Sequence, residues 1–313
     1  MSVCGLRVIK PGPLTLLQDR GRFGYQHLGL SPGGAADEHA FLWANRLLGN
    51  ASNAPALEIT LGGLSLAVER SLQIALTGAD LRASVNGRSL KPWRTHTLAA
   101  GDRLQFGYAS DGVRGYLAVR GGFEVALCFG SVATVTREKM GGLDGVGSPL
   151  QAGDELACPE MGLVAERSVP SRFIPDYRQP LTLRLMASEH KGWFSAAALE
   201  RLYRSEYRLS PRSDRMGARL EGEAVESLVG GIVSEPVPFG AVQVPPDGVP
   251  IVLLKDRQTI GGYPKLGTVH PLDAFALAQR QPGCPIRFAP VTVENCAEQY
   301  NEFQGFMDGV RVS

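Results

Sequence analysis

The stretch LQIALTGADLRASVNGRSL, residues 72–90, carries the strongest local fold signal in the chain. Two short β-type runs, at residues 72–77 and 81–85, are followed directly by Asn86-Gly87. Asn-Gly is the preferred pair for a two-residue hairpin turn, because both residues adopt positive φ at low cost. The stretch therefore predicts antiparallel strands that are joined by tight turns.

Runs of the same kind recur on both sides of this stretch. Neighbouring runs are often about 8–12 residues apart, which favours a sandwich or barrel over a parallel sheet. The chain also contains 38 Gly and 21 Pro in 313 residues, above the usual combined share of about 12%, and such a composition implies many turns. The additional runs are residues 14–17, 56–60, 104–107, 115–119, 181–185, 242–244, 251–254 and 286–289. They predict a mainly β protein.

Four segments predict helices instead, and each begins at a residue suited to a helix N-terminus. Ser, Thr and Asp side chains accept hydrogen bonds from the free N–H groups of a first turn, and Pro fits that turn without losing a bond. The starting residues are Asp37, Ser195, Pro271 and Thr292. We expect the third helix to end near Gly283 and the fourth before Gly305.

A proline-rich segment divides the chain into two β-rich halves. Residues 158–180 are richer in proline and charge than their flanks, which is typical of a connection. The predicted halves are residues 1–165 and 166–313, with an approximate boundary and with exchange of segments between them left open.

Charge and composition exclude several classes of partner. The net charge is +1, with 32 basic and 31 acidic residues, so no field for binding nucleic acid is expected. No apolar run approaches the roughly 18 residues of a membrane-spanning helix, and residues 1–10 lack the long apolar segment of a signal peptide. The five cysteines form no C-x-x-C pair, and the histidines have no metal-ligand spacing. We therefore expect a cytoplasmic protein with reduced thiols and without a metal site, a nucleic-acid partner or a membrane partner.

Residues 29–33, GLSPG, match the G-x-S-x-G pattern of a nucleophile elbow but lack its chemistry. In an elbow, the residue after the serine donates its backbone N–H to the oxyanion hole. Here that residue is Pro32, which has no N–H. Ser31 is therefore not expected to act as a nucleophile. The chain also lacks a P-loop pattern, so any ATP would be bound in another way.

Four glycine-containing blocks have unusual polar residues at fixed positions. Glycine permits close backbone approach, and polar side chains on such loops often serve binding. The blocks are LLQDRGRFG at 16–24 with GGAAD at 33–37 and ANRLLGN at 44–50; ALEIT at 56–60; SDRMG at 213–217 with RLEG at 219–222; and GAVQVP at 240–245 with QTIGGYP at 258–264.

The last block predicts a pocket for a small, planar, polar ligand such as a ureido ring or a lactam. Gly261 and Gly262 can expose consecutive N–H groups as an anion nest, and Gln243 ends a strand that can place its amide in the same pocket. Further polar groups around the nest are Asp256, Gln258, Thr259 and Tyr263.

Arg215 is a candidate for binding an anion in the third block. A guanidinium group can hold an oxyanion, phosphate or carboxylate through two parallel hydrogen bonds. The alternative is structural: Arg215 would then pair with Asp214, Glu221 or another carboxylate to pin its loop.

Together the four blocks resemble the carboxyltransferase subdomain A and B family, which includes the Kip antagonist protein, the carboxyltransferase region of urea carboxylase and the C-type component of 5-oxoprolinase. The resemblance extends from about Leu6 to Tyr300. It implies two cyclophilin-like β-barrel subdomains with a few covering helices, and a partner with subdomains C and D that shares the active site. The family's usual Ser-Gly-Ala-Met-Asp and Met-Gly-Tyr-Arg-Leu appear here as GGAAD and MGARL, which weakens the transfer of roles to positions 33, 36 and 218.

The resemblance implies an enzymatic function within a complex. A chain with subdomains A and B alone is similar to the 5-oxoprolinase members, which together with A-type and B-type components hydrolyse 5-oxo-L-proline to L-glutamate at the expense of ATP. Arg215 and the 261–262 nest would then stabilise negative charge, and Asp214 or Asp256 would act as the base. The substrate-orienting residues would be Gln243, Gln258, Thr259 and Tyr263.

Two alternatives stay open at this point. One is carboxyl transfer from biotin, carried by a partner chain, to a urea-like acceptor. The other is a regulator that binds a kinase inhibitor, as the Kip antagonist name implies.

Overall fold

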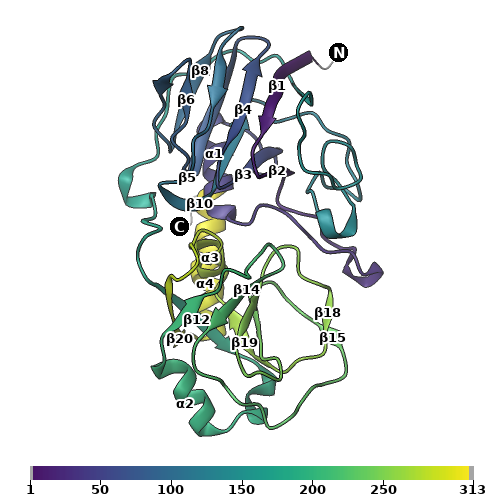
Figure 1. Ribbon diagram of the computed structural model, residues 1–313, viewed down its shortest axis with the longest axis vertical. Coiled ribbons are helices and arrows are strands. Elements are labelled where there is room, and N and C mark those ends of the chain that lie inside the picture. Colours follow the sequence, from purple (N-terminus) through teal and green to yellow (C-terminus); the bar gives the residue numbers. More distant parts are fainter. Residues whose placement is uncertain (1–2, 310–313) are drawn as a thin grey trace. The chain divides into compact units, whose positions relative to one another are not determined.

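The chain divides into two compact units in the computed structural model, which describes residues 3–309 (Figure 1). One unit comprises Met1–Phe23 and Pro32–Tyr177, and the other comprises Gly24–Ser31 and Arg178–Ser313. The division between Tyr177 and Arg178 lies inside the proline-rich segment. The short segment Gly24–Ser31 belongs to the second unit although it lies early in the sequence.

The first unit consists of two sheets that enclose one apolar core. The six-stranded sheet has the order β11 (Glu155–Cys158), β1 (Val3–Pro11), β4 (Leu64–Val68), β9 (Arg103–Gln105), β6 (Ser84–Val85) and β7 (Arg88–Ser89). The five-stranded sheet has the order β2 (Leu14–Gln18), β3 (Ala56–Thr60), β10 (Asp111–Val119), β5 (Leu72–Asp80) and β8 (Arg94–Leu98). Helix α1 (Glu38–Leu48) packs on β5 and β10, and the short 3-10 helices η2 (Thr136–Glu138) and η3 (Ser171–Phe173) lie in connections.

The predicted hairpin is present in the first unit. Strands β6 and β7 pair antiparallel, and the turn residues Asn86 and Gly87 have φ of 49° and 81°. Positive φ at both central residues is the backbone of a type I′ turn. Of the predicted run 81–85, only Ser84 and Val85 form a strand.

The second unit is a closed barrel. Its strands follow the order β12 (Leu181–Ala187), β19 (Lys265–Val269), β16 (Ala241–Gln243), β17 (Ile251–Leu253), β14 (Gly217–Glu221), β13 (Tyr207–Leu209) and β20 (Pro285–Pro290). Its interior is filled by apolar side chains, among them Leu183, Leu220, Val242, Val252 and Ile286. A separate two-stranded ribbon pairs β15 (Glu235–Pro236) with β18 (Ile260–Gly261).

The four predicted helices are present, and their N-terminal residues are as expected. The side chains of Asp37, Ser195 and Thr292 each accept a hydrogen bond from the first turn, and Pro271 opens α3 (Pro271–Leu277). The other two are α2 (Ala196–Arg204) and α4 (Val293–Met307). The second unit also contains the 3-10 helices η1 (Gln26–Leu28) and η4 (Glu189–Trp193).

Two helix ends differ from the prediction. α3 ends at Leu277, well before Gly283, and α4 continues through Gly305 to Met307. A single glycine inside a helix costs only about 1 kcal/mol relative to alanine, which a longer helix tolerates.

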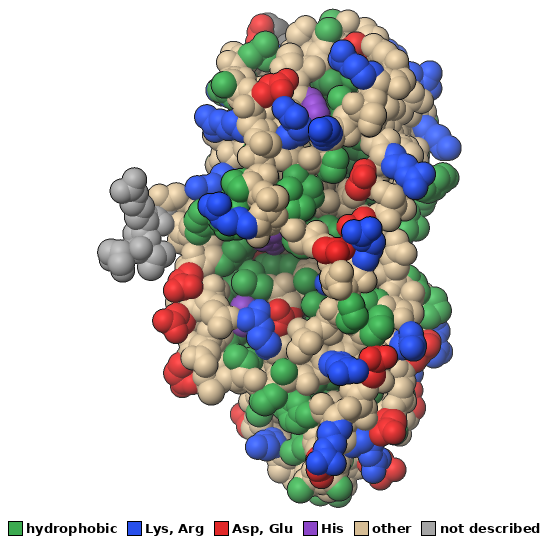
Figure 2. All heavy atoms as spheres, turned by 90° about the vertical axis from the view of Figure 1, so that its left-hand side faces the viewer, with side chains coloured by type: hydrophobic (Ala, Val, Ile, Leu, Met, Phe, Trp, Pro, Cys, Tyr) green, Lys and Arg blue, Asp and Glu red, His purple; other side chains and the backbone are tan. Residues whose placement is uncertain are grey.

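The mainly β class with few helices is confirmed, and the closed barrel is found in the second unit. In the first unit the strands belong to two sheets. Alternating strands and tight turns are compatible with either arrangement, so the sequence pattern could not separate them. Within residues 3–309, no helix combines the length and apolar character needed to cross a membrane. Figure 2 shows acidic and basic side chains interspersed over the visible face, as a net charge of +1 suggests.

Candidate functional site

Arg215 and Asp256 form a buried ion pair in the second unit. Arg215 Nε lies 2.8 Å from Asp256 Oδ2, and Nη2 lies 2.9 Å from Oδ1. The side chains keep only 8% and 6% of their exposure. They meet because β14 and β17 are antiparallel neighbours, and these residues lie just beyond the strand ends. This geometry matches the structural alternative for Arg215, with Asp256 as the partner. The catalytic roles of both residues stay predictions.

Asp214 caps the turn that carries Arg215. Its Oδ1 accepts hydrogen bonds from the backbone N–H groups of Met216, at 2.8 Å, and Gly217, at 3.2 Å. These bonds set the direction of the loop into β14, so Asp214 has a structural task whether or not it also serves as a base.

Ser31 and Arg257 hold the backbone that directly follows β17 in place. The Ser31 hydroxyl is buried and donates to the Arg257 carbonyl at 2.7 Å, as a structural serine does. The Arg257 guanidinium donates to the Val237 carbonyl at 3.0 Å and the Leu254 carbonyl at 3.3 Å. Burial lowers the pKa of Arg257 to about 10. These bonds hold residues 254–257 beside Val237, which directly follows β15 (Glu235–Pro236).

Gln243 and Gly261 come together as the sequence predicted, but as packing partners. A Cβ atom placed on Gly261 would lie 2.4 Å from Gln243 Nε2, so only glycine fits there without a shift. Gln243 is 2% exposed, and its Nε2 donates to no atom within residues 3–309. A buried amide N–H without an acceptor is costly, so this group requires an acceptor such as an ordered water molecule or a ligand.

The predicted nest at Gly261 and Gly262 is not formed. Neither glycine is among those with positive φ, whereas the αR–αL form of a nest needs one residue of that kind. Gly261 instead pairs with Glu235 in the ribbon, and the Gly262 carbonyl accepts from Ile232 N at 2.9 Å. The two glycines therefore allow close packing of the ribbon on the barrel.

The other predicted site residues of this block do not take part in the contact between Gln243 and Gly261. The Thr259 carbonyl accepts from Val237 N at 3.1 Å, and Tyr263 is 41% exposed. Within the described part of the chain, the side chains of Gln258, Thr259 and Tyr263 make no hydrogen bond. Their predicted role in orienting a substrate is neither supported nor contradicted by these contacts.

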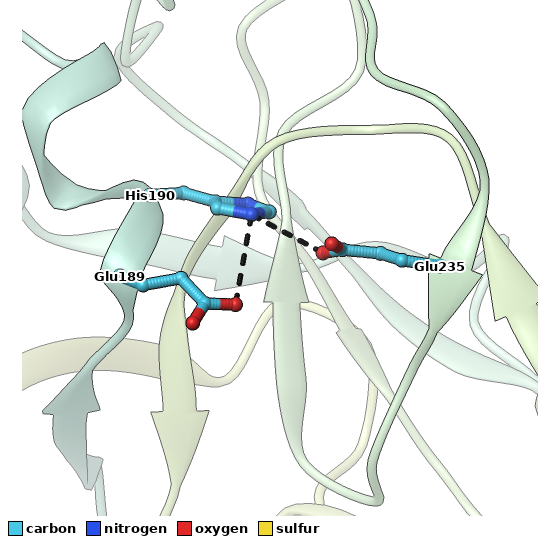
Figure 3. Close-up of side chains that lie close together, drawn as sticks. All are labelled: Glu189, His190 and Glu235. Carbon is cyan, nitrogen blue, oxygen red and sulfur yellow. Dashed lines mark ion pairs between the residues drawn. The ribbon is translucent and has the colours of Figure 1, made fainter.

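Glu235, Lys265 and His190, which the sequence did not single out, lie close together, and Figure 3 shows the His190 ring and the Glu235 carboxylate pointing toward each other. Glu235 Oε1 lies 2.5 Å from Lys265 Nζ and 3.2 Å from His190 Nε2. These are ion-pair distances, although the angles of both contacts fall outside hydrogen-bond geometry. The His190 ring stacks on Trp193 with ring centroids 4.0 Å apart. Lys265 directly follows the block 258–264, which is the one sequence signal for the cluster.

The strand register places these side chains on one face. Residues directly opposite each other in antiparallel strands point the same way, with Cβ atoms about 4.5–5.5 Å apart. Gly261 is opposite Glu235, and Gln243 is opposite Lys265. Because Gln243 Nε2 lies 2.4 Å from the place where a Cβ atom of Gly261 would be, it is within about 8 Å of the Glu235 Cβ atom. The Lys265–Glu235 ion pair therefore lies near the contact between Gln243 and Gly261.

The distances at this cluster would admit a metal ion, but the chemistry does not suit one. Ligand atoms of Glu189, His190 and Glu235 lie within 4.8 Å of one another. However, the Lys265 ammonium already neutralises the Glu235 oxygen. His190 Nδ1 accepts the backbone N–H of Lys265 at 3.3 Å, so the neutral ring carries its proton on Nε2, the atom a metal would need. Glu189 is mostly exposed and 3.9 Å from the ring.

The sequence blocks of the first unit have structural roles. Tyr116 Oη donates to Glu58 Oε2 at 2.8 Å and accepts from Asp37 N at 2.8 Å. Burial raises the pKa of Tyr116 well above its ordinary value. Asp19 accepts hydrogen bonds from the Ser131 hydroxyl at 2.7 Å and from Val132 N at 3.0 Å. Glu58 and Asp19 thus satisfy buried hydrogen-bond donors of other elements, which gives the blocks that contain them a structural role.

Comparison with known proteins adds a family and relatives. Residues 28–290 match the family model described as carboxyltransferase domain, subdomain A and B. The chain is 35% identical over 305 residues to the C-type component of 5-oxoprolinase from Escherichia coli, covering 97% of this chain and 96% of that protein. The protein of the same name from Haemophilus influenzae is 34% identical over 303 residues, 94% of each chain. The solved structure of the K. lactis urea amidolyase is similar with a TM-score of 0.91 and 26% identity, over 100% of this chain but 20% of that one.

Proposed function

Because the chain belongs to the family of carboxyltransferase subdomains A and B, we propose that it is the C-type component of an ATP-dependent 5-oxoprolinase, which hydrolyses 5-oxo-L-proline to L-glutamate. The observation that carries the proposal is the coverage in both directions. The chain spans 96% of the E. coli 5-oxoprolinase component but only 20% of the urea amidolyase. The chain therefore corresponds in length to the 5-oxoprolinase component, whereas it corresponds to only a small part of the urea amidolyase.

The proposal includes partner chains. We expect A-type and B-type components, the latter with subdomains C and D, to complete the active site and to share the binding of ATP. Two features support this expectation: the relatives are named as parts of a multi-chain enzyme, and a P-loop pattern is absent from the sequence.

The chemistry explains why ATP is needed. A lactam carbonyl is a poor electrophile, so transfer of a phosphoryl group to its oxygen would prepare the carbon for attack by water. In this scheme the second unit of the chain binds and orients the lactam, and Gln243, whose amide donates to no atom within residues 3–309, is the candidate donor to it.

Reconstitution tests the proposal. The purified chain, combined with the A-type and B-type components, should release glutamate from 5-oxoproline only when ATP is present. The chain alone should be inactive. Robust ATP-dependent cleavage by the isolated chain, or no cleavage by the complete complex, would contradict the assignment.

Carboxyl transfer to a urea-like acceptor is the second candidate. The structural similarity to urea amidolyase over the whole chain favours it. Biotin would then be carried by a partner. Urea-dependent decarboxylation of a carboxybiotin-bearing partner in the presence of this chain, without glutamate release from 5-oxoproline, would support this second function.

A further inference from the structure

We propose that a cleft on the first unit binds a small molecule that carries a phosphate group. The cleft has a volume of about 390 Å³ and is lined by residues of β6, β7 and β8 and of the connections beside them. The residues assigned to the lactam belong to the second unit, whereas this cleft belongs to the first. The inference therefore goes beyond the proposed function and does not depend on it.

The cleft forms where the two sheets of the first unit end. β7 is the last strand of the six-stranded sheet, and β8 is the last strand of the five-stranded sheet. On β8, Arg94 and His96 lie opposite Leu76 and Ile74, which are core residues. Directly opposite residues of antiparallel strands point the same way. Arg94 and His96 therefore point from the edge strand toward the space between the sheets.

The floor of the cleft is apolar, and its rim is positively charged. Val85 and Leu90 line it and are only 3% and 9% exposed. The charged groups of the lining are three cations and one carboxylate: Arg88, Lys91, Arg94 and Glu166. Burial lowers the pKa of His96, so its ring adds no charge at neutral pH. A concave surface lined by an excess of one charge focuses the field and raises the local concentration of the opposite ion.

Two of the cations are available to a ligand. Arg88 and Lys91 are exposed, and their side chains form no ion pair or hydrogen bond within residues 3–309. Arg94, in contrast, donates to Glu166 at 3.0 Å. The His96 ring donates from Nε2 to the Lys91 carbonyl at 2.8 Å. This bond holds the backbone that carries Lys91 beside β8, so the cleft is formed before a ligand arrives.

A phosphate group suits this pair of cations. It carries about −1.5 to −2 charges at pH 7, which two cations neutralise. The Arg88 guanidinium can bind two of its oxygens at once, and the Lys91 ammonium can contact another as a point charge. The apolar floor is suited to the rest of the molecule. The volume lies near the lower end of the roughly 300–1,000 Å³ that is usual for small-molecule sites.

Cations at the edge of a sheet also have a purely structural use. Charged side chains on edge strands prevent them from pairing with the strands of other molecules. If this is the only role of Arg88 and Lys91, neutral variants self-associate, and compounds with phosphate groups do not bind at the cleft.

Calorimetry on the purified chain tests the proposal. The probes are adenosine monophosphate, inorganic phosphate, adenosine, and succinate as a dianion without phosphorus. Arg88→Ala combined with Lys91→Ala should weaken binding of the phosphate compounds at least about 10-fold, because charge-assisted hydrogen bonds are lost. Lys10→Ala removes an exposed cation of β1 and is the matched control, which should bind like the wild type. Thermal unfolding and sedimentation check the fold and the association state of each variant.

Binding of adenosine monophosphate or inorganic phosphate that only the double variant weakens supports the site. Tighter binding of the monophosphate than of phosphate then identifies a nucleotide as the source of the group, and equal binding identifies free phosphate. The proposal is overturned if neither compound binds, or if the double variant binds like the wild type. It is also overturned if Lys10→Ala loses as much affinity, or if adenosine or succinate binds as tightly as the phosphate compounds.

Discussion

The sequence made Arg215 a candidate for binding an anion, but in the structure its side chain forms an ion pair that stabilises the fold. Its guanidinium group is directed at Asp256 through two short contacts, and both side chains are almost fully buried. Removing one partner of a buried ion pair leaves an uncompensated charge, which typically costs about 3–5 kcal/mol.

Arg215→Ala should therefore lower the free energy of unfolding by about 3–5 kcal/mol, measured by urea denaturation. Arg215→Lys should recover only part of this, because an ammonium group cannot make the paired contacts. Arg212→Ala, in the same loop but exposed, is the matched control and should change stability little. If Arg215→Ala lowers turnover of the complex without any loss of stability, the anion-binding role holds instead.

For Ser31, we expect that substitution leaves the activity nearly unchanged. Ser31→Ala removes the hydrogen bond to the Arg257 carbonyl, which should cost about 1 kcal/mol of stability. Turnover should stay nearly intact, because Pro32 cannot supply an oxyanion-hole donor. A loss of turnover of about 100-fold, or about 2.7 kcal/mol of barrier, with folding preserved would show that Ser31 takes part in catalysis.

At the scale of elements, the ribbon of β15 and β18 brings Glu235 and Gly261 to the residues of the barrel around Gln243. It carries Glu235 on one strand and Gly261 on the other, and it packs on the barrel where Gln243 and Lys265 lie opposite each other. The close fit between Gly261 and Gln243 gives this packing a sharp steric requirement.

Gly261→Ala should displace the ribbon or the Gln243 amide, since the added methyl would lie 2.4 Å from Nε2. We expect at least about a 10-fold loss in kcat/KM for the complex, since misplacement by about 1 Å can cost 100-fold. Gly230→Ala is the control, because a Cβ atom there would have no heavy atom within 4 Å. Equal effects of the two variants on kcat/KM would mean that the packing of Gln243 under the ribbon is not required for activity.

At the scale of the whole molecule, the structure gives an expectation about metal ions. Zn²⁺ or Mn²⁺ that bound the folded chain would raise its unfolding temperature by mass action. Because Lys265 and the His190 tautomer oppose a cation at Glu235, neither ion at micromolar concentration should shift the unfolding temperature. A clear upward shift that Glu235→Gln removes would show that the cluster is a metal site after all.

The sequence by itself determined the features that depend on neighbouring residues. The β-type runs, the Asn86-Gly87 turn and the helix starts at Asp37, Ser195 and Thr292 all follow from local backbone preferences and local hydrogen bonds. The exclusion of an elbow at Ser31 is of this kind too, because a missing N–H on Pro32 is a covalent fact. Family membership also followed from the sequence, since the order of its blocks is specific.

Only the tertiary structure decided which polar groups meet. Arg215 and Asp256 are 41 residues apart, and His190 and Lys265 are 75 residues apart. No local preference encodes such pairs, since they arise from the order in which strands close the barrel. The same holds for Gln243, whose predicted partner Gly261 proved to be a steric neighbour of its amide. The sequence specifies which polar side chains are present. Which of them lie next to each other depends on the register of the strands, and this register is set by the packing of the whole sheet.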